Sequence, residues 1–239
     1  MFLLLLIAGT IYIMRTNPDV APWQRSDGGV FGTVYHFTYQ HRDNCDSVLV
    51  RAMQRVDGSL SMFNDQSTLS RINDNRTDTC DALFGEMFAL ATEVSRKTDG
   101  AFDVTVAPLV HAWGFGRKRG VLPDSATVDS LRALVGWQRV KLEGHRVVKD
   151  DARMVMDFSA IAKGYGCDMV ARALDSLGVQ NYMVEIGGEV VVRGHNPKGK
   201  SWQVGVSKPN DDTNGGQALQ TIMSCRDEAM ATSGNYRNY

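Results

Sequence analysis

The sequence has few cysteines, and they are not clustered. The four are separated by long stretches, with no Cys-x-x-Cys pair and no Cys/His group at zinc-ligand spacing, which excludes a cysteine-based zinc site. Export would permit a disulfide. Cys45 and Cys80, both near predicted helix starts, are the better candidate pair, and four unrelated thiols are the alternative. Cys167 falls on a predicted helix and is interpreted as a small core residue.

An excess of charge is also missing. The 239 residues include 26 basic and 27 acidic side chains, for a formal net charge of −1. Nucleic-acid-binding domains usually carry a basic excess, so this class is disfavoured, although a site for a single phosphate group remains open. The composition is not that of a disordered, collagen-like or coiled-coil chain, and 43% hydrophobic residues suffice for a normal core.

No apolar run is long enough for an ordinary membrane span. Met1–Met14 reads MFLLLLIAGTIYIM, whereas a bilayer core needs about 20 apolar residues. No basic residue precedes this run and no small-x-small cleavage site follows it, yet it resembles the apolar part of a signal peptide or signal anchor. We therefore expect such a segment over 1–14, a polar linker over 15–29 and a folded domain over 30–239. A buried N-terminal helix is the alternative for the first segment.

Periodicity predicts a mixture of long helices and antiparallel hairpins, which is the α+β class, with antiparallel sheets packed against helices. Leu49, Met53, Val56 and Leu60 are spaced as one helical face. Further helices are expected after Asp81, over 124–135 and after Ser159. The expected strands are 30–39, 139–142, 146–148, 154–158, 182–186, 189–193 and 202–206. Residues 101–123, rich in aromatics and glycine, are predicted to be a loop that lines a ligand pocket.

The residues that indicate chemistry are concentrated in Asp157–Gly166, DFSAIAKGYG. A strand is expected to end at Asp157 and a helix to begin after Ser159. A cation such as Lys163 near the first helical turn is unfavourable by up to about 1 kcal/mol, unless an anion such as phosphate lies between them. Gly164 and Gly166 would allow close approach, at a cost in helix stability. A solvated lysine with two packing glycines is the alternative, and the P-loop spacing is absent.

The run Asp157–Gly194 (DFSAIAKGYGCDMVARALDSLGVQNYMVEIGGEVVVRG) resembles the FAD:protein FMN transferases, the ApbE family. Further stretches match this family in the expected order, and the resemblance covers about residues 30–239. They are LSMF at 60–63 with SRIN at 70–73, KTDGAFDVTVAPLVHAWGFG at 97–116, and ATSGNYRNY at 231–239. The resemblance implies an ApbE/T-fold-like architecture.

The resemblance also implies a reaction. Such enzymes cleave FAD at its pyrophosphate, join the FMN phosphate to a threonine hydroxyl of a target protein and release AMP, with the assistance of Mg²⁺. The implied partners are FAD and a threonine-bearing acceptor, either a membrane redox complex subunit or an exported flavoprotein. The implied location is the periplasmic side of the bacterial inner membrane. An FAD pyrophosphatase that needs no acceptor and a non-catalytic exported flavin-binding protein are the alternatives.

Site residues follow from the resemblance position by position. Ala160 would offer its backbone carbonyl to the metal, and Asp103 could instead cap local backbone amides. The residues matching positions that contact FAD are Phe31, Phe63, Ala101, Phe102, Asp103, Asp157 and Lys163. Two departures from the family pattern stand out. Phe31-Gly32-Thr33 replaces Met-Gly-Thr, and the family's His-x-x-Asp-Pro-x-Thr-Gly and Asp/Thr metal motifs are expected beyond Tyr239. The resemblance thus implies a C-terminally truncated chain with weak or no activity, whose catalytic residues lie outside it.

Overall fold

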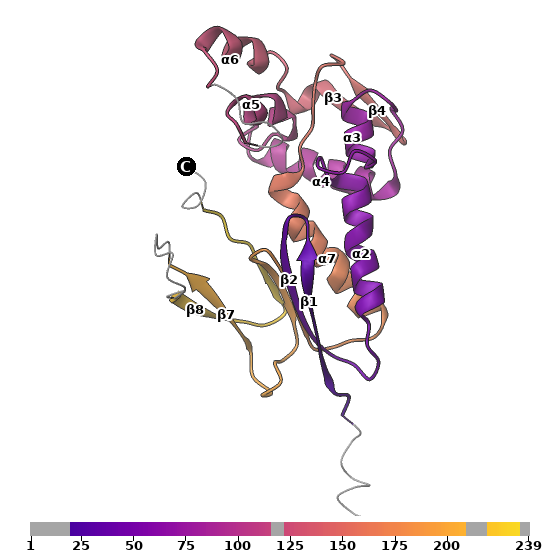
Figure 1. The fold of residues 1–239 in the computed structure, drawn as a ribbon, viewed down its shortest axis with the longest axis vertical. Helices are drawn as coiled ribbons and strands as arrows, with labels where there is room; N and C mark the ends of the chain where they lie inside the picture. The colour runs from indigo at the N-terminus through magenta and orange to yellow at the C-terminus, as the bar shows by residue number, and fades with distance from the viewer. Residues whose placement is uncertain (1–19, 116–121, 209–218, 235–239) are drawn as a thin grey trace, which may run out of the picture.

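The computed structural model describes residues 20–115, 122–208 and 219–234 (Figure 1). The expected signal or anchor segment 1–14 lies outside these ranges. The chain forms an antiparallel sheet covered on one face by two long helices, with a smaller helical region at one end and a two-stranded ribbon beside the sheet (Figure 1). The predicted α+β class is confirmed. In the described ranges, no helix combines the length and apolar character needed to cross a membrane.

The main sheet has five strands in the order β1-β2-β5-β6-β9, and every neighbouring pair is antiparallel. Its strands are β1 Trp23–Val30, β2 Thr33–Gln40, β5 Tyr182–Ile186, β6 Glu189–Arg193 and β9 Glu228–Met230. The linker expected over 15–29 is therefore wrong from Trp23 onward. Those residues pair along the whole of β2, so tertiary pairing overrides their polar, glycine-containing sequence.

Helices α2 (Asp46–Leu60) and α7 (Ser159–Ser176) cover one face of this sheet (Figure 1). The predicted apolar face of α2 is confirmed, because its four residues are almost completely buried. The N-terminal half of α2 and the C-terminal half of α7 pack on the sheet in one core cluster. That cluster includes Phe37, Tyr39, Leu49, Met53, Val170, Leu174 and Val184.

A second core lies in the helical region. Its elements are α3 Thr68–Asn73, α4 Ala82–Lys97, the 3₁₀ turn η1 Val104–Val106, α5 Ala107–Ala112, α6 Ser125–Arg132, the 3₁₀ turn η2 Trp137–Arg139, β3 Val140–Glu143 and β4 Arg146–Lys149. Helix α4 begins directly after Asp81, as the sequence predicts, and Asp81 caps it by accepting the Phe84 N–H at 2.8 Å. The segment 101–123 is not simply a loop, since it contains η1 and α5; residues 116–121 lie outside the described ranges.

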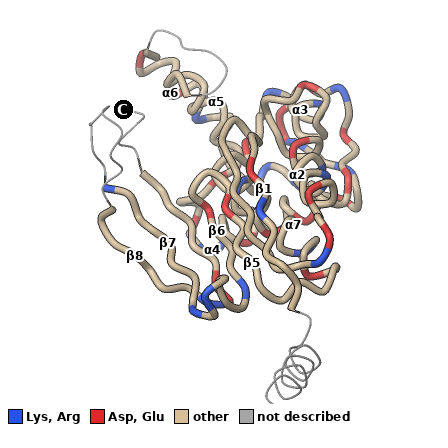
Figure 2. Tube along the Cα trace, turned by 60° about the horizontal axis from the view of Figure 1, so that its bottom comes forward, with Lys and Arg blue, Asp and Glu red and all other residues tan. Residues whose placement is uncertain are grey.

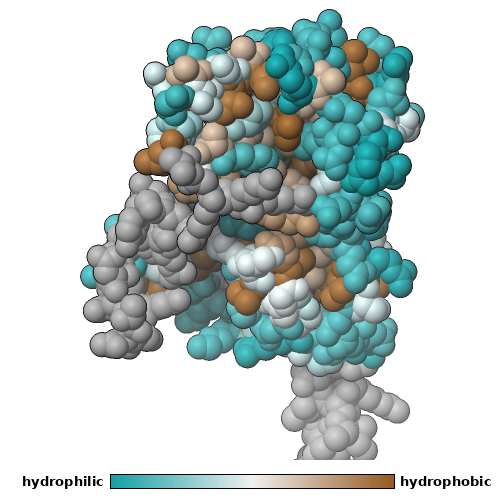
Figure 3. All heavy atoms as spheres, turned by 45° about the horizontal axis from the view of Figure 1, so that its top comes forward, coloured by the Kyte–Doolittle hydropathy of each residue, from teal (hydrophilic) through white to brown (hydrophobic). Residues whose placement is uncertain are grey.

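The remaining strands, β7 Trp202–Ser207 and β8 Leu219–Cys225, form a separate ribbon. Trp202, Val204 and Cys225 pack against Val190 and Val192 of β6 in a third, small core. Figure 2 shows Lys, Arg, Asp and Glu interspersed over the helices, while β7 and β8 carry none. The face in Figure 3 is hydrophilic along its right side, with apolar atoms nearer its middle.

One strand predicted from the sequence is wrong, and the structure decides between the two alternatives for the cysteines. Residues 154–158 are not a strand, because their backbone groups bond to an asparagine side chain and to loop carbonyls rather than to a neighbouring strand. The Cys45–Cys80 disulfide does not form. All four cysteines are buried free thiols, and these two belong to different core clusters.

Candidate functional site

The N-terminus of α7 is held by Asp157. Its Oδ1 accepts the Ser159 N–H at 2.7 Å, and its own N–H donates to the carbonyl oxygen of Val104 at 2.7 Å. The N-cap residue is Phe158, which cannot cap with its side chain. The helix thus begins at Ser159 rather than after it, and Asp157 satisfies one of the N–H groups of its first turn.

The first two turns of α7 bring the separate motif stretches together. The Ser159 hydroxyl donates to Met62 Sδ at 3.6 Å, which places the 60–63 stretch beside the helix start. The Asp157–Val104 bond attaches the 97–116 stretch. Deeper in the same helix, Lys163 Nζ donates to the carbonyl oxygen of Gly187 at 3.1 Å. Segments distant in sequence thus meet at one helix end.

The segment leading into α7 is fixed by an amide that the sequence alone did not single out. Asn73, at the end of α3, donates through Nδ2 to the Met156 carbonyl at 2.8 Å and accepts the Met156 N–H through Oδ1 at 2.9 Å. These two bonds satisfy the N–H and the carbonyl of Met156, as a neighbouring strand would in a sheet. The sequence-based prediction included Asn73 only as the last residue of the SRIN stretch, which ends α3, and that stretch does not indicate its partner Met156.

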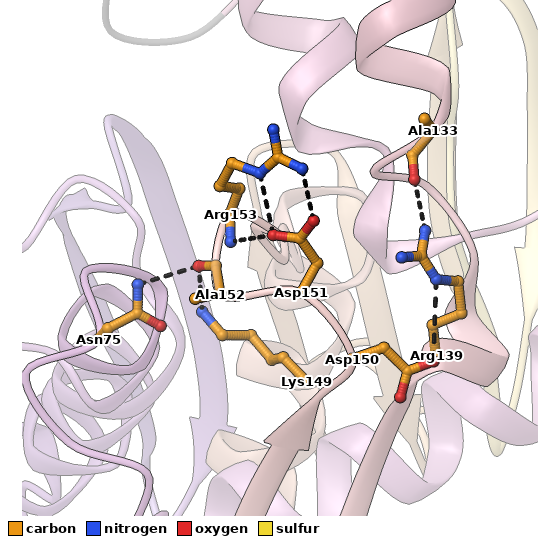
Figure 4. A network of polar contacts seen from close by, with 8 residues as sticks. All are labelled: Asn75, Ala133, Arg139, Lys149, Asp150, Asp151, Ala152 and Arg153. Carbon is orange, nitrogen blue, oxygen red and sulfur yellow. Dashed lines mark hydrogen bonds and ion pairs between the residues drawn. The ribbon is translucent and has the colours of Figure 1, made fainter.

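Lys149 anchors the same segment from the other side. Its Nζ donates to the carbonyl oxygens of Ile72, Ala152 and Met154, each at 3.2 Å, and burial lowers the pKa of this ammonium. Figure 4 shows Asn75 reaching the same Ala152 carbonyl, at 2.9 Å. In the adjoining turn, hydrogen bonds from Arg153 lower the pKa of Asp151 to about 2 (Figure 4).

The turn between β5 and β6 forms the other side of the site. Gly187 and Gly188 have φ values of 56° and 96°, which favour glycine. A Cβ at Gly187 would lie 2.8 Å from Thr33 Cγ2 and 3.3 Å from Lys163 Cδ, so the bare backbone makes room for both side chains. The Thr232 hydroxyl donates to the Gly188 carbonyl at 3.3 Å, so the start of the 231–239 stretch also contacts this turn. Residues 235–239 lie outside the described ranges.

Lys163 has an anionic partner within the chain. Its Nζ lies 2.8 Å from Glu189 Oε2, at the start of β6. A cation at this helix start was expected to need an anion, and in this structure the protein's own carboxylate meets that need. The contact of Lys163 with FAD stays a prediction.

The two glycines of α7 play different parts. A Cβ at Gly166 would lie 2.7 Å from Phe31 Cε2 and 3.4 Å from Ile186 Cδ1, so this glycine makes room for the Phe31 ring. A Cβ at Gly164 would meet nothing within 4 Å. Close approach is therefore confirmed at Gly166, where the neighbour is a protein side chain.

Alanine at these two positions should have different effects. Removing a helical glycine stabilises by up to about 1 kcal/mol, and we expect Gly164→Ala to show this gain. Gly166→Ala should not show this gain in stability, because the new methyl group would force the Phe31 ring to move. Urea unfolding of both variants provides the measurement, and equal stabilities would contradict the packing role of Gly166.

Asp103 makes three hydrogen bonds within the protein. Its Oδ1 accepts from the N–H and hydroxyl of Thr105 at 2.8 and 2.6 Å, and its Oδ2 accepts the Trp137 N–H at 3.0 Å. Thr105 Oγ1 in turn accepts the Gly136 N–H at 2.7 Å. The structure thus places this carboxylate in the local capping role that was the alternative at the sequence level.

The other predicted site residues differ in exposure. Phe63 is 65% exposed in the loop after α2, whereas Phe31 is half-buried at the β1–β2 turn with a φ of 51°. Ala101 and Ala160 are exposed and Phe102 packs on the helical core. Two hollows, of about 740 and 460 Å³, lie elsewhere, around Arg193 and around Lys149. Neither is lined by a predicted FAD-contact residue.

Known proteins resemble this chain over most of its length. The ApbE family description matches residues 31–239. An FAD:protein FMN transferase of Vibrio cholerae is 37% identical over 223 residues, which is 89% of this chain and 66% of that protein; one from Haemophilus influenzae is 34% identical with the same coverage of each chain. The chain thus spans just under two thirds of the length of these relatives.

Solved structures agree with the sequence comparison. The flavin transferase ApbE from Vibrio cholerae superposes with a TM-score of 0.81 at 34% identity, covering 92% of this chain and 74% of that one. The apo form of a Pseudomonas stutzeri flavinyl transferase ApbE gives a TM-score of 0.80 at 29% identity, covering 94% and 74%. The arrangement of helices and antiparallel sheet is therefore shared with these proteins.

Proposed function

Because this chain belongs to the ApbE family, we propose that it acts as an FAD:protein FMN transferase. In the proposed reaction a threonine hydroxyl of a target protein attacks the FMN phosphorus of FAD, the pyrophosphate bond breaks and AMP leaves. The observation that carries this proposal is the junction at the start of α7. Met62 and Val104, from two of the other motif stretches, contact Ser159 and Asp157 there, and Gly187, later in the same run as α7, contacts Lys163.

The residues at this junction suit a flavin nucleotide. The ring of Phe63 is largely exposed and offers a face on which an isoalloxazine can stack. The Lys163 ammonium is held at the Gly187–Gly188 turn and remains partly exposed. Phosphoryl transfer depends mainly on positioning and on neutralisation of charge, and a fixed cation supplies both. We propose that Lys163 faces the FAD phosphates while Phe63 faces the flavin ring.

Magnesium assistance is part of the proposal for the family reaction. In residues 20–115, 122–208 and 219–234, however, no group of three or more His, Cys, Asp or Glu side chains is placed to hold a metal ion. Ala160 could offer a metal ion only its backbone carbonyl, because its side chain has no ligating atom. These residues do not by themselves fit a magnesium site, so none of the steps proposed for them depends on a metal.

An assay of AMP release tests the proposed function. The purified full chain is incubated with FAD and Mg²⁺, with a threonine-bearing acceptor, with an acceptor whose threonine is replaced by alanine, and without acceptor. We expect AMP together with covalent FMN on the threonine acceptor only, and at no more than the weak level that the resemblance implies for this chain. AMP without acceptor would instead identify an FAD pyrophosphatase, and FAD binding without AMP a non-catalytic flavin-binding protein.

Replacing Lys163 should weaken FAD binding. Because charge-assisted hydrogen bonds to phosphate are strong, we expect Lys163→Ala to raise the FAD dissociation constant about tenfold or more. Lys97→Ala is the matched control, since Lys97 also pairs with a glutamate, Glu93 at 2.5 Å, but on the exposed surface of α4. Fluorescence titration measures the FAD dissociation constants of both variants. Equal constants would show that Lys163 does not contact FAD.

The location and the acceptor also belong to the proposal. We place the protein on the periplasmic side of the bacterial inner membrane, and its acceptor among membrane redox complexes and exported flavoproteins. The apolar character of Met1–Met14 supports an export or anchor segment. Fractionation of cells that produce the full chain provides the test.

A further inference from the structure

Glu189 has an environment unlike that of an ordinary surface glutamate. It follows the Gly187–Gly188 turn directly, and its side chain is only 13% exposed. Its Oε2 is buried and accepts no hydrogen bond of good geometry, although Lys163 Nζ lies 2.8 Å away. Among the described residues, the ion pair found for this carboxylate is the one with Lys163. The buried charge of Glu189 therefore depends on Lys163.

The register of the hairpin sets this arrangement. Glu189 pairs with Ile186, so both side chains lie on the same face of the sheet, and Ile186 packs toward Gly166 of α7. The Cys167 thiol also donates to the Glu189 carbonyl oxygen at 3.3 Å, which ties β6 to the helix. Glu189 is thus directed at the helix by sheet geometry and backbone contact together.

Lys163 keeps some capacity for a further partner. An ammonium has three N–H donors. One reaches the Gly187 carbonyl at 3.1 Å, another faces Glu189, and the side chain is still 36% exposed. An incoming phosphate would therefore meet a cation whose charge is already largely offset by a carboxylate that repels the same phosphate.

We propose that Glu189 is an internal counter-ion that occupies Lys163 in the empty site and limits how tightly that lysine binds a ligand phosphate. Glu189 is thereby a specificity-determining residue: it lowers the preference of the site for anionic over neutral flavins and so eases the exchange of phosphate-bearing ligands. This proposal rests on the proposed function, because it takes Lys163 to face the phosphates of FAD.

The test compares FAD, which carries phosphates, with riboflavin, which carries none. Glu189→Gln keeps an oxygen that can accept from Lys163 but removes the negative charge. By Coulomb's law with the dielectric constant of bulk water we expect this variant to bind FAD about fivefold more tightly and riboflavin unchanged, with the gain shrinking as salt rises. In a Lys163→Ala background no ammonium holds a phosphate beside Glu189, so the same substitution should change the FAD-to-riboflavin affinity ratio much less.

Glu185→Gln is the matched control. Glu185 lies on the same hairpin but on the opposite face of the sheet, where its carboxylate accepts the Gly188 N–H at 2.7 Å and lies 3.9 Å from His36 Nε2. We expect its FAD-to-riboflavin ratio to equal that of the unaltered protein. If Glu189→Gln does not fold, Glu189→Asp keeps the charge one methylene farther from Lys163, and a smaller gain in FAD affinity is expected.

Each outcome decides between the two proposals. Unchanged or weaker FAD binding by Glu189→Gln, or an equal gain for riboflavin, would overturn the counter-ion role. So would a gain that persists in full without Lys163. If Lys163→Ala itself leaves FAD affinity intact, the phosphate contact of the proposed function fails, and the counter-ion role of Glu189 fails with it. Normal weakening by Lys163→Ala with no effect of Glu189→Gln refutes the counter-ion role alone.

Discussion

Replacing Asn73 with alanine is expected to lower the free energy of unfolding by about 2–5 kcal/mol, because each buried backbone group left without a partner costs about 1–3 kcal/mol. Asn73 makes both hydrogen bonds of the Met156 backbone, and Met156 is completely buried. In the part of the chain that the structure describes, no strand pairs with Met156, so these two bonds come from the Asn73 side chain. The free energy of unfolding in urea is the measurement.

Asn75→Ala provides the control for this effect. Asn75 also donates to a backbone carbonyl, that of Ala152 at 2.9 Å, but it is exposed, and Lys149 donates to the same oxygen. Water can replace its amide, so we expect a loss of about 1 kcal/mol, most of it the strain of alanine at the left-handed φ of 56°. Comparable losses for Asn73→Ala and Asn75→Ala would show that the paired bonds to Met156 contribute little.

The second large effect is expected at Asp103. Asp103→Ala removes the acceptor of three hydrogen bonds, two from Thr105 and one from the Trp137 N–H, and leaves the fully buried Thr105 short of a partner. Hydrogen bonds to a charged acceptor contribute about 1.5–3 kcal/mol each and are not additive, so we expect a total loss of about 3 kcal/mol. Urea unfolding again provides the measurement.

Asp124→Ala is the appropriate comparison for Asp103→Ala. Asp124 caps the exposed helix α6 through one bond, to the Thr127 N–H at 2.8 Å. Loss of such a cap costs about 1 kcal/mol. If Asp103→Ala proves as mild as Asp124→Ala while FAD binding is lost, the carboxylate of Asp103 serves the ligand rather than the fold.

The elements predicted well from the sequence are those with strong local signals. Helix α2 follows from apolar residues at helical spacing, and α4 begins directly after Asp81, where a helix was expected. The strands expected over 182–186 and 189–193 are confirmed, with the Gly187-Gly188 turn between them. In each case the relevant interactions lie within a few turns of chain, so periodicity and turn residues are sufficient to detect them.

Long-range pairing accounts for the errors. Met154, Met156 and Phe158 alternate like the buried face of a strand, yet the backbone of Met156 pairs with the side chain of Asn73, 83 residues away. Strand β1 has a polar, glycine-containing sequence and is stabilised by its register with β2. No local pattern encodes either partner, so neither could be predicted without the fold.

The candidate site shows the same division. The resemblance correctly grouped the stretches that meet at α7, and the anomaly of a cation near the helix start was a sound physical signal. The identity of the anion was not predictable, since Glu189 lies 26 positions after Lys163 and reaches it only through the β5–β6 register. Asp103 was recognised as a site candidate, but its three partners depend on the placement of the 136–137 turn.

The four buried thiols can serve as chemical probes of local unfolding, because a buried thiol reacts only when the core around it opens. Each core holds at least one: Cys80 in the helical core, Cys45 and Cys167 between the helices and the sheet, and Cys225 under the ribbon. Burial raises the pKa of Cys167 to about 12, so this thiol is unreactive while α7 stays packed on the sheet. Alkylation rates at the four positions therefore report separately how often each core opens, without introduced labels.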